Sequence, residues 1–156
     1  MITVEIPGRE KLTLKNIVLD FNGTIALDGV LLPGVADRLN ALSSVLNVYI
    51  LTADTFGTCK TACSCIKCNV VVLSEIPGAE EKLNFIKKLG AEKTAAVGNG
   101  VNDSLMLAKA ALGIFVLGPE GASVKAHEAA DIVVSDVRHG LDLLLNPKRV
   151  VATLRP

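Results

Sequence analysis

Two apolar runs in this chain each end at a polar turn that contains glycine, and this arrangement constrains the fold more than any other feature. Residues 16–19 lead into Asp-Phe-Asn-Gly-Thr at 20–24, and residues 94–97 lead into Gly-Asn-Gly-Val-Asn-Asp at 98–103. Short apolar runs bounded by turn residues are typical of parallel strands that are buried on both faces. The carboxyl ends of such strands meet at the ligand-binding edge of an open α/β sheet. We therefore expect the two turns to form one site.

Strand-length apolar runs and longer amphipathic runs alternate along most of the chain. The expected strands cover 16–20, 48–52, 70–73, 94–98, 112–116 and 132–134, and the expected helices cover 35–46, 55–67, 79–89, 103–110, 123–129 and 137–145. This alternation predicts a doubly wound α/β fold, with a parallel sheet between two layers of helices. Residues 3–6 and 11–14, joined at Pro7-Gly8, predict a hairpin at the sheet edge, and residues 147–156 are expected to form a tail.

Composition favours one globular domain over residues 1–156, because half of the 156 residues are hydrophobic and suffice for a core. The 16 basic residues balance the 16 acidic ones, and aromatic residues make up 3% of the chain. This composition provides neither the basic surface nor the stacking side chains of a nucleic-acid-binding protein. No apolar run has the length of a membrane span, and the N-terminus does not resemble a signal sequence. We therefore expect a cytoplasmic protein with no nucleic-acid or membrane partner.

Four short motifs, in this order, resemble those of the haloacid dehalogenase (HAD) superfamily of phosphatases and phosphotransferases. They lie at residues 20–24, at Thr52 after a strand, at Lys82, and at residues 98–103. The last motif matches Gly-Asp-Gly-Val-Asn-Asp except at Asn99. Within the superfamily the chain most resembles the phosphorylation domain of P-type ATPases, from residue 17 to residue 145. The resemblance implies a HAD-like Rossmannoid fold with a flap hairpin, and the short spacing between motifs leaves no room for a cap domain.

The resemblance also implies a role for each matched residue. Catalytic roles fall to Asp20 as the nucleophile, Asn22, Thr52 and Lys82; phosphate-binding roles fall to Gly23, Thr24, Thr52, Ala53, Lys82 and Asn102; and Mg²⁺ ligands are expected at Asp20, Asn22, Asn99 and Asp103. A carboxylate nucleophile attacks phosphorus and splits the transfer into two steps. The chain is therefore expected to be a Mg²⁺-dependent phosphohydrolase or phosphotransferase that forms an aspartyl-phosphate on Asp20. Its expected substrate is a small phosphorylated compound, ATP or an acyl phosphate.

Two asparagines stand where phosphatases of this superfamily carry aspartate. Asn22 cannot exchange a proton at neutral pH, and losing general acid–base help slows a reaction by about 10²- to 10⁴-fold. Asn99 removes one negative charge from the expected Mg²⁺ site, and we expect weaker Mg²⁺ binding as a result. Turnover should therefore be slow. The alternative is a catalytically impaired module that binds phosphate or a partner.

Four cysteines, Cys59, Cys63, Cys65 and Cys68, lie close enough in sequence to suggest a thiol-based metal or redox site. At about 100° per residue, Cys59 and Cys63 share one helix face, whereas Cys65 and Cys68 point to the opposite side. A simple four-thiolate site is therefore not expected on a regular helix. The plainer interpretation makes Cys59 and Cys63 small core residues and leaves the other two near the surface.

Residues 25–32 place Asp28-Gly29 between apolar residues, which is a strong hairpin signal. This segment falls where HAD proteins carry a flap over the site. Its apolar side chains suggest an interface, and we expect a homo-oligomer through this hairpin. The alternative is a hairpin that folds back onto its own domain and covers Val35 and Leu39.

Overall fold

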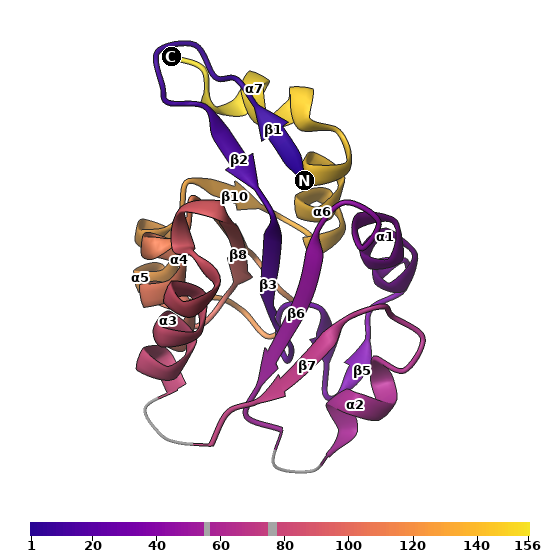
Figure 1. Ribbon diagram of the computed structural model, residues 1–156. Helices are drawn as coiled ribbons and strands as arrows, with labels where there is room; N and C mark the ends of the chain where they lie inside the picture. The colour runs from indigo at the N-terminus through magenta and orange to yellow at the C-terminus, as the bar shows by residue number, and fades with distance from the viewer. Residues whose placement is uncertain (55–56, 75–77) are drawn as a thin grey trace.

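The computed structural model describes residues 1–54, 57–74 and 78–156. In these ranges a six-stranded parallel sheet forms the centre of the molecule, with the strand order β10-β9-β8-β3-β6-β7 (Figure 1). Its strands are β3 (Asn16–Asp20), β6 (Asn47–Thr52), β7 (Asn69–Val72), β8 (Thr94–Gly98), β9 (Leu112–Val116) and β10 (Ile132–Val134). The predicted doubly wound α/β fold is therefore confirmed, and β3 lies next to β8, as the two polar turns require.

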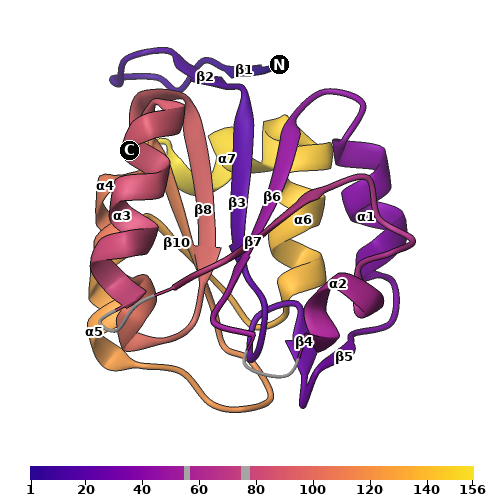
Figure 2. The same cartoon turned by 60° about the horizontal axis from the view of Figure 1, so that its bottom comes forward.

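Helices cover both faces of this sheet, and Figure 2 shows the two layers on either side of the strands. One layer holds α1 (Val35–Leu42) and α6 (Val137–Leu145), and the other holds α3 (Gly78–Leu89), α4 (Ser104–Lys109) and α5 (Val124–Ala129). The buried apolar side chains form two clusters. Alternate side chains of β3 pack into different clusters: Ile17 and Leu19 into one, and Val18 into the other. A strand buried on both faces is continuously apolar, which explains the sequence of β3.

Two short 3₁₀ helices, η1 (Ala91–Lys93) and η2 (Val101–Asp103), precede β8 and α4. The helix expected over 55–67 is much shorter, since α2 covers Thr58–Ala62, and residues 55–56 lie outside the described residues. The Asn40 side chain explains the early end. Its amide nitrogen donates to the Cys65 carbonyl and its oxygen accepts from the Lys67 N–H, at 2.9 and 2.8 Å, so these groups bond outside a helix. Helix α1 likewise ends at Leu42, before the expected residue 46.

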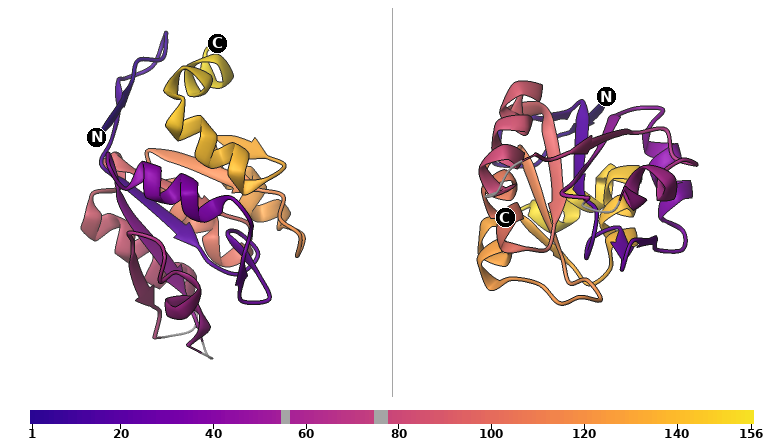
Figure 3. Two further views of the ribbon diagram at one scale, coloured as in Figure 1. Left: turned by 90° about the vertical axis from the view of Figure 1, so that its right-hand side faces the viewer. Right: turned by 90° about the horizontal axis from the view of Figure 1, so that it is seen from below.

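The N-terminal hairpin and the C-terminal residues lie together, at the end of the molecule opposite the carboxyl ends of the strands (Figures 1 and 3). β1 (Ile2–Val4) and β2 (Leu12–Leu14) pair antiparallel as expected, but they form a sheet of their own instead of an edge of the central one. The tail expected over 147–156 is corrected to helix α7 (Pro147–Leu154). Pro147 suits the first turn of a helix, and the buried Val150 joins the core that contains Ile2 and Val4.

The flap segment forms the predicted hairpin from β4 (Ala26–Leu27) and β5 (Val30–Leu31). Asp28 and Gly29 make its turn with positive φ angles of 50° and 79°. Ile25 and Ala26 are fully buried, while Leu31 and Leu32 pack against the core. Val30 alone among the apolar hairpin residues is largely exposed, at 69%. The hairpin thus folds back onto its own domain, and assembly through it stays a prediction.

No helix in the described ranges is both long and apolar enough to cross a bilayer.

Helix α7 should contribute measurably to stability through Val150. The change Val150→Ala removes two methyl groups from a fully buried side chain and should lower the free energy of unfolding by about 1–2 kcal/mol. The matched change Val124→Ala, at a side chain that is 73% exposed, should alter it by less than about 0.5 kcal/mol. Urea unfolding of both variants measures the difference. Equal effects would show that α7 does not pack as described.

Candidate active site

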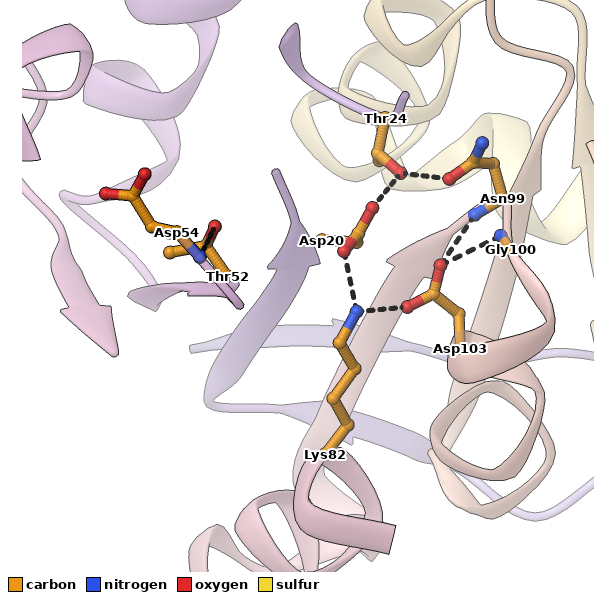
Figure 4. Close-up of polar contacts among 8 residues, drawn as sticks. All are labelled: Asp20, Thr24, Thr52, Asp54, Lys82, Asn99, Gly100 and Asp103. Atoms are coloured by element: carbon orange, nitrogen blue, oxygen red, sulfur yellow. Dashed lines mark hydrogen bonds and ion pairs between the residues drawn. The ribbon is translucent and has the colours of Figure 1, made fainter. Parts of the chain in front are cut away.

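Asp20 stands at the carboxyl end of the central strand β3, where one side chain from the following loop and one from α3 contact it (Figure 4). Lys82 of α3 donates from Nζ to Asp20 Oδ1 at 2.6 Å, and Thr24 donates from Oγ1 to Asp20 Oδ2 at 3.1 Å. The Asp20 side chain is 12% exposed and lines a cleft, so its carboxylate is held in place and still accessible. A positioned, accessible carboxylate can act as a nucleophile.

Lys82 lies between two carboxylates and is almost fully buried, with 1% exposure. Its Nζ lies 2.6 Å from Asp20 Oδ1 and 2.6 Å from Asp103 Oδ1. The other oxygen of Asp103 accepts from the backbone N–H groups of Asn99 and Gly100, both at 3.0 Å. A buried charge without a partner is strongly destabilising, and here each charge has at least one. The predicted functional Lys82 is therefore in the site and is not a solvent-facing helix residue.

The pKa values in this group reflect burial and the unequal number of charges. Burial, followed by the nearby Asp103 charge, raises the pKa of Asp20 from 3.8 to about 6, although Lys82 opposes the shift. Burial alone would lower the pKa of Lys82, but Asp20 and Asp103 outweigh it and raise that pKa. The lysine is therefore firmly charged, and two carboxylates compete for it. The group as a whole has a deficit of positive charge.

Three oxygen atoms crowd around one hydroxyl hydrogen beside Asp20. Thr24 Oγ1 lies 3.1 Å from Asp20 Oδ2 and 3.1 Å from Asn99 Oδ1. A hydroxyl has one hydrogen to donate, so it can bond only one of these two acceptors at a time. The acceptor that does not receive this hydrogen then faces the lone pairs of Thr24 Oγ1.

Asn99 uses both ends of its amide. Its Oδ1 faces Thr24, and its Nδ2 donates to the Gly121 carbonyl at 3.1 Å. Because a carbonyl only accepts, the amide orientation is determined: the oxygen must point toward Thr24 and Asp20. A carboxylate at this position could not donate to Gly121. Asn99 thus brings an oxygen to the site and also fixes the loop that carries Gly121.

Thr52 ends β6, and its hydroxyl oxygen accepts the Asp54 N–H at 3.0 Å. The Asp54 carboxylate in turn accepts the N–H groups of Thr58 and Cys59, each at 3.0 Å, and so connects the strand end to α2. Figure 4 shows that Thr52 lies apart from the Lys82 group, across the end of the sheet. Among the described residues the Thr52 hydroxyl donates to no acceptor, so its hydrogen can serve a ligand in the cleft.

A cleft of about 980 Å³ opens at this edge of the sheet. Of the residues predicted for the site, it is lined by Asp20, Asn22, Thr52, Ala53, Lys82, Asn99 and Asn102. The other three, Gly23, Thr24 and Asp103, support it from behind, and Thr24 and Asp103 are fully buried. The Asn22 side chain does not reach toward Asp20's partners: its Oδ1 accepts the Gly29 N–H at 3.0 Å and ties down the flap hairpin.

Among the described residues, three carboxylates that were not predicted for the site also line the cleft: Asp28, Asp54 and Glu120. Each follows a sequence signal that could have been used. Asp54 and Glu120 come shortly after the carboxyl ends of β6 and β9, and Asp28 precedes glycine in a hairpin turn. Residues 75–77, which precede α3, lie outside the described residues.

The four cysteines are not among the described residues that line this cleft. Cys59 and Cys63 are buried with their sulfur atoms 4.0 Å apart, whereas Cys65 is exposed and Cys68 is half-buried. The neighbouring Cys59 thiol and burial raise the pKa of Cys63 to about 12, so that thiol stays protonated at neutral pH. This arrangement agrees with the interpretation of Cys59 and Cys63 as core residues.

The donor set of the site fits a hard cation such as Mg²⁺. In the described ranges no group of three or more His, Cys, Asp or Glu side chains could hold a metal ion, so amide or backbone oxygens would have to contribute. Asp20 Oδ2 and Asn99 Oδ1 meet at Thr24 with one hydrogen between them, and a cation there would relieve the repulsion of their lone pairs. Oxygen ligands from a carboxylate and an amide are those that Mg²⁺ accepts.

Replacing Lys82 should destabilise the protein, because the buried carboxylates of Asp20 and Asp103 lose their positively charged partner. We expect Lys82→Met to lower the free energy of unfolding by about 3–5 kcal/mol at pH 7, because two carboxylates are left without their cation. Loss of the cation raises the already elevated pKa of Asp20 further. The folded protein then takes up a proton as the pH falls, so the destabilisation should be smaller at pH 5 than at pH 7.

Denaturant unfolding at both pH values, in the presence of a chelator, measures this. Lys87→Met is the matched control, since Lys87 lies exposed on the same helix and should change little. Losses of equal size at pH 5 and pH 7 would contradict the proposed charge balance.

Comparisons with known proteins give relatives by sequence and by fold. No protein-family model matches the chain. The sequence is 34% identical over 134 residues to a copper-exporting P-type ATPase of Staphylococcus aureus, and the match covers 84% of this chain but 16% of that protein. It is 49% identical over 78 residues to an uncharacterized protein of Methanocaldococcus jannaschii, covering 47% of this chain and 84% of that one.

Solved structures show the same fold. The structure of 3-deoxy-D-manno-octulosonate 8-phosphate phosphatase from Moraxella catarrhalis, a complex with magnesium and phosphate ions, superposes with a TM-score of 0.72 at 17% identity, over 91% of this chain and 94% of that one. The catalytic domain of the CPx-ATPase CopB-B superposes with a TM-score of 0.61 at 28% identity, over 74% of this chain and 46% of that one. Fold and sequence together place this chain in the HAD superfamily and confirm its resemblance to the phosphorylation domain of P-type ATPases.

Proposed function

We propose that the protein is a Mg²⁺-dependent phosphohydrolase or phosphotransferase that works through an aspartyl-phosphate on Asp20. One observation carries the proposal: the Asp20 carboxylate is fixed by Lys82 and Thr24 at the sheet edge, yet it opens to the cleft. A carboxylate that merely capped a turn would need neither a buried lysine nor a cleft. The substrate class is a small phosphorylated compound, ATP or an acyl phosphate.

In the first step, a carboxylate oxygen of Asp20 attacks the phosphorus atom. The new O–P bond forms as the bond to the leaving oxygen breaks, and the leaving group departs with that electron pair. Lys82 balances the negative charge on Asp20 and on the incoming phosphoryl group. Thr52 Oγ1 already accepts from Asp54, so its hydrogen is available to donate to a phosphoryl oxygen.

In the second step, an acceptor attacks the aspartyl-phosphate and releases the carboxylate. Water as the acceptor gives inorganic phosphate, and a hydroxyl compound gives a transferred phosphoryl group. Asn22 can neither take the proton from the acceptor nor supply one to the first leaving group. Both steps therefore favour reactants that need little proton transfer, such as acyl phosphates.

When bound, Mg²⁺ would add positive charge to offset the phosphoryl oxygens, and Asp20, Asn99 and the Asn22 backbone are the groups proposed to hold it. Asp103 would act indirectly, because its oxygens already bond Lys82 and the N–H groups of Asn99 and Gly100.

A second candidate function is a phosphate- or partner-binding module without turnover. It is favoured by the structural use of both asparagines, since Asn22 holds the flap hairpin and Asn99 holds the Gly121 loop. A protein that has lost its catalytic activity would still retain side chains with such structural roles. Detection of a covalent intermediate separates the two candidates.

The covalent intermediate gives the direct test. After incubation with Mg²⁺ and acetyl phosphate and an acid quench, peptide mass spectrometry should find phosphate on Asp20. Asp20→Asn should abolish the label because an amide is not a nucleophile here, whereas Asp37→Asn, at an exposed position on α1, should keep it. An unlabelled wild-type protein, or equal label in the Asp20 variant, would favour the binding module.

Restoring a proton-exchanging group should speed the reaction of poor leaving groups. Asn22→Asp keeps the oxygen that accepts from Gly29, so the hairpin should hold, and it should raise turnover of an alkyl phosphate by about 10-fold or more. Turnover of acetyl phosphate should rise less. Asn84→Asp adds the same charge at an exposed position of α3 and should change neither rate. An equal gain on both substrates would argue against a missing general acid.

A further inference from the structure

Residues 118–121 form a tight turn that lies against the site. None of the sequence motifs includes these residues. The sequence of the turn is Gly-Pro-Glu-Gly, and the Gly121 N–H donates to the Gly118 carbonyl at 3.0 Å. Proline in the second position and glycine in the fourth are typical of such a turn. Gly118 approaches the Asp20 loop closely, because a Cβ placed on it would lie 2.1 Å from the Gly23 carbonyl oxygen. Only glycine fits there.

Asn99 fastens this turn to the site from the other side. Its Nδ2 donates to the Gly121 carbonyl at 3.1 Å, and its own carbonyl accepts the Ser123 N–H at 2.8 Å. The turn is thus held at three of its sides, by Gly23, by the Asn99 side chain and by the Asn99 backbone. Asn99, which stands where the family motif has aspartate, therefore helps to fix the position of this turn.

Held in this way, the turn places the Glu120 carboxylate beside Asn99, where the family motif would carry a negatively charged aspartate. A Cβ placed on Gly23 would lie 2.7 Å from Glu120 Oε2 and 2.7 Å from Asn99 Nδ2, so the two side chains flank the same point. Glu120 lines the cleft and is exposed. Among the described residues its carboxylate forms no hydrogen bond or ion pair with the rest of the chain. No partner in the described part of the chain explains its placement.

The charge count of the site shows what such a carboxylate can do. Lys82 neutralises one of the two buried carboxylates, Asp20 and Asp103, and the neutral Asn99 contributes an oxygen without charge. Mg²⁺ retains several water molecules when it binds to protein, and a carboxylate near those waters can accept hydrogen bonds from them. Such a group stabilises the cation without being its ligand. This role agrees with the absence, in the described ranges, of any three acidic, Cys or His side chains able to hold a metal by themselves.

We propose that Glu120 supplies the negative charge that Asn99 lacks and thereby strengthens Mg²⁺ binding as a carboxylate next to the ion's ligands. The proposal rests on the proposed function, since it assumes the same Mg²⁺ site. Asn99 has two parts in it: it gives an amide oxygen and positions the turn that brings Glu120. The hydrogen bond from Asn99 Nδ2 to the Gly121 carbonyl holds the turn, and the turn carries the Glu120 carboxylate.

Calorimetric titration of the whole chain with MgCl₂, at fixed pH and ionic strength, tests this without any substrate. Glu120→Gln should weaken Mg²⁺ binding by about 10-fold, the usual cost of removing a carboxylate that supports a metal from outside its ligands. Glu128→Gln is the matched control, because it removes the same charge from an exposed position on α5 and should leave the affinity unchanged. Thermal unfolding in chelator should show both variants as stable as the wild type.

The coupling between the two positions is the sharper measurement. Asn99→Asp should restore affinity in the Glu120→Gln background but gain little in the wild type, where it releases Gly121 and places two carboxylates side by side. The two changes should therefore be strongly non-additive. Additive effects, or an unchanged affinity in Glu120→Gln, would overturn the role of Glu120 and leave the proposed function standing. A wild type that does not bind Mg²⁺ would overturn both, whereas Mg²⁺ binding that depends on Glu120 in a protein with no label on Asp20 would remove the enzymatic function alone.

Discussion

The interaction on which the site depends is the contact of one buried lysine with two buried carboxylates. Lys82 reaches from α3 to Asp20 on β3 and to Asp103 beside α4, so it joins one helical layer to the sheet and to the adjoining loop. Desolvation makes each of these charges costly alone, and their mutual attraction offsets much of that cost. A single cation thereby holds together the end of β3, the start of α4 and Asp20, the proposed nucleophile. The remaining negative charge makes the site receptive to a further cation.

The two asparagines show how a change of chemistry is coupled to a change of structure. Replacing a carboxylate by an amide removes charge, but it adds a hydrogen-bond donor. At Asn99 that donor binds the Gly121 carbonyl, which an aspartate would repel. At Asn22 the retained oxygen binds the flap hairpin through Gly29. Both positions therefore order segments that border the cleft.

The central sheet could be predicted because each strand is apolar throughout and each crossover is short, which leaves few possible topologies. The meeting of Asp20 and Lys82 followed from motifs at the ends of those elements. Helix α7 was missed because Pro147 marks both the end of one helix and the start of the next. Glu120 was missed for a different reason. Its turn is visible in the sequence, but its location depends on contacts of Gly118 with Gly23 and of Gly121 with Asn99, which are distant in sequence.

Under the proposed function, the groups around Asp20 would favour formation of an aspartyl-phosphate over its breakdown. Attack on phosphorus requires a positioned carboxylate and positive charge, and both are present through Thr24 and Lys82. Breakdown by water requires a group that removes a proton, and the side chain at position 22 is an amide already bonded to Gly29. The asymmetry predicts a phosphoenzyme that persists. In the proposed reaction a neutral residue at position 22 is compatible with function, because a long-lived aspartyl-phosphate is the product that such a site would make best.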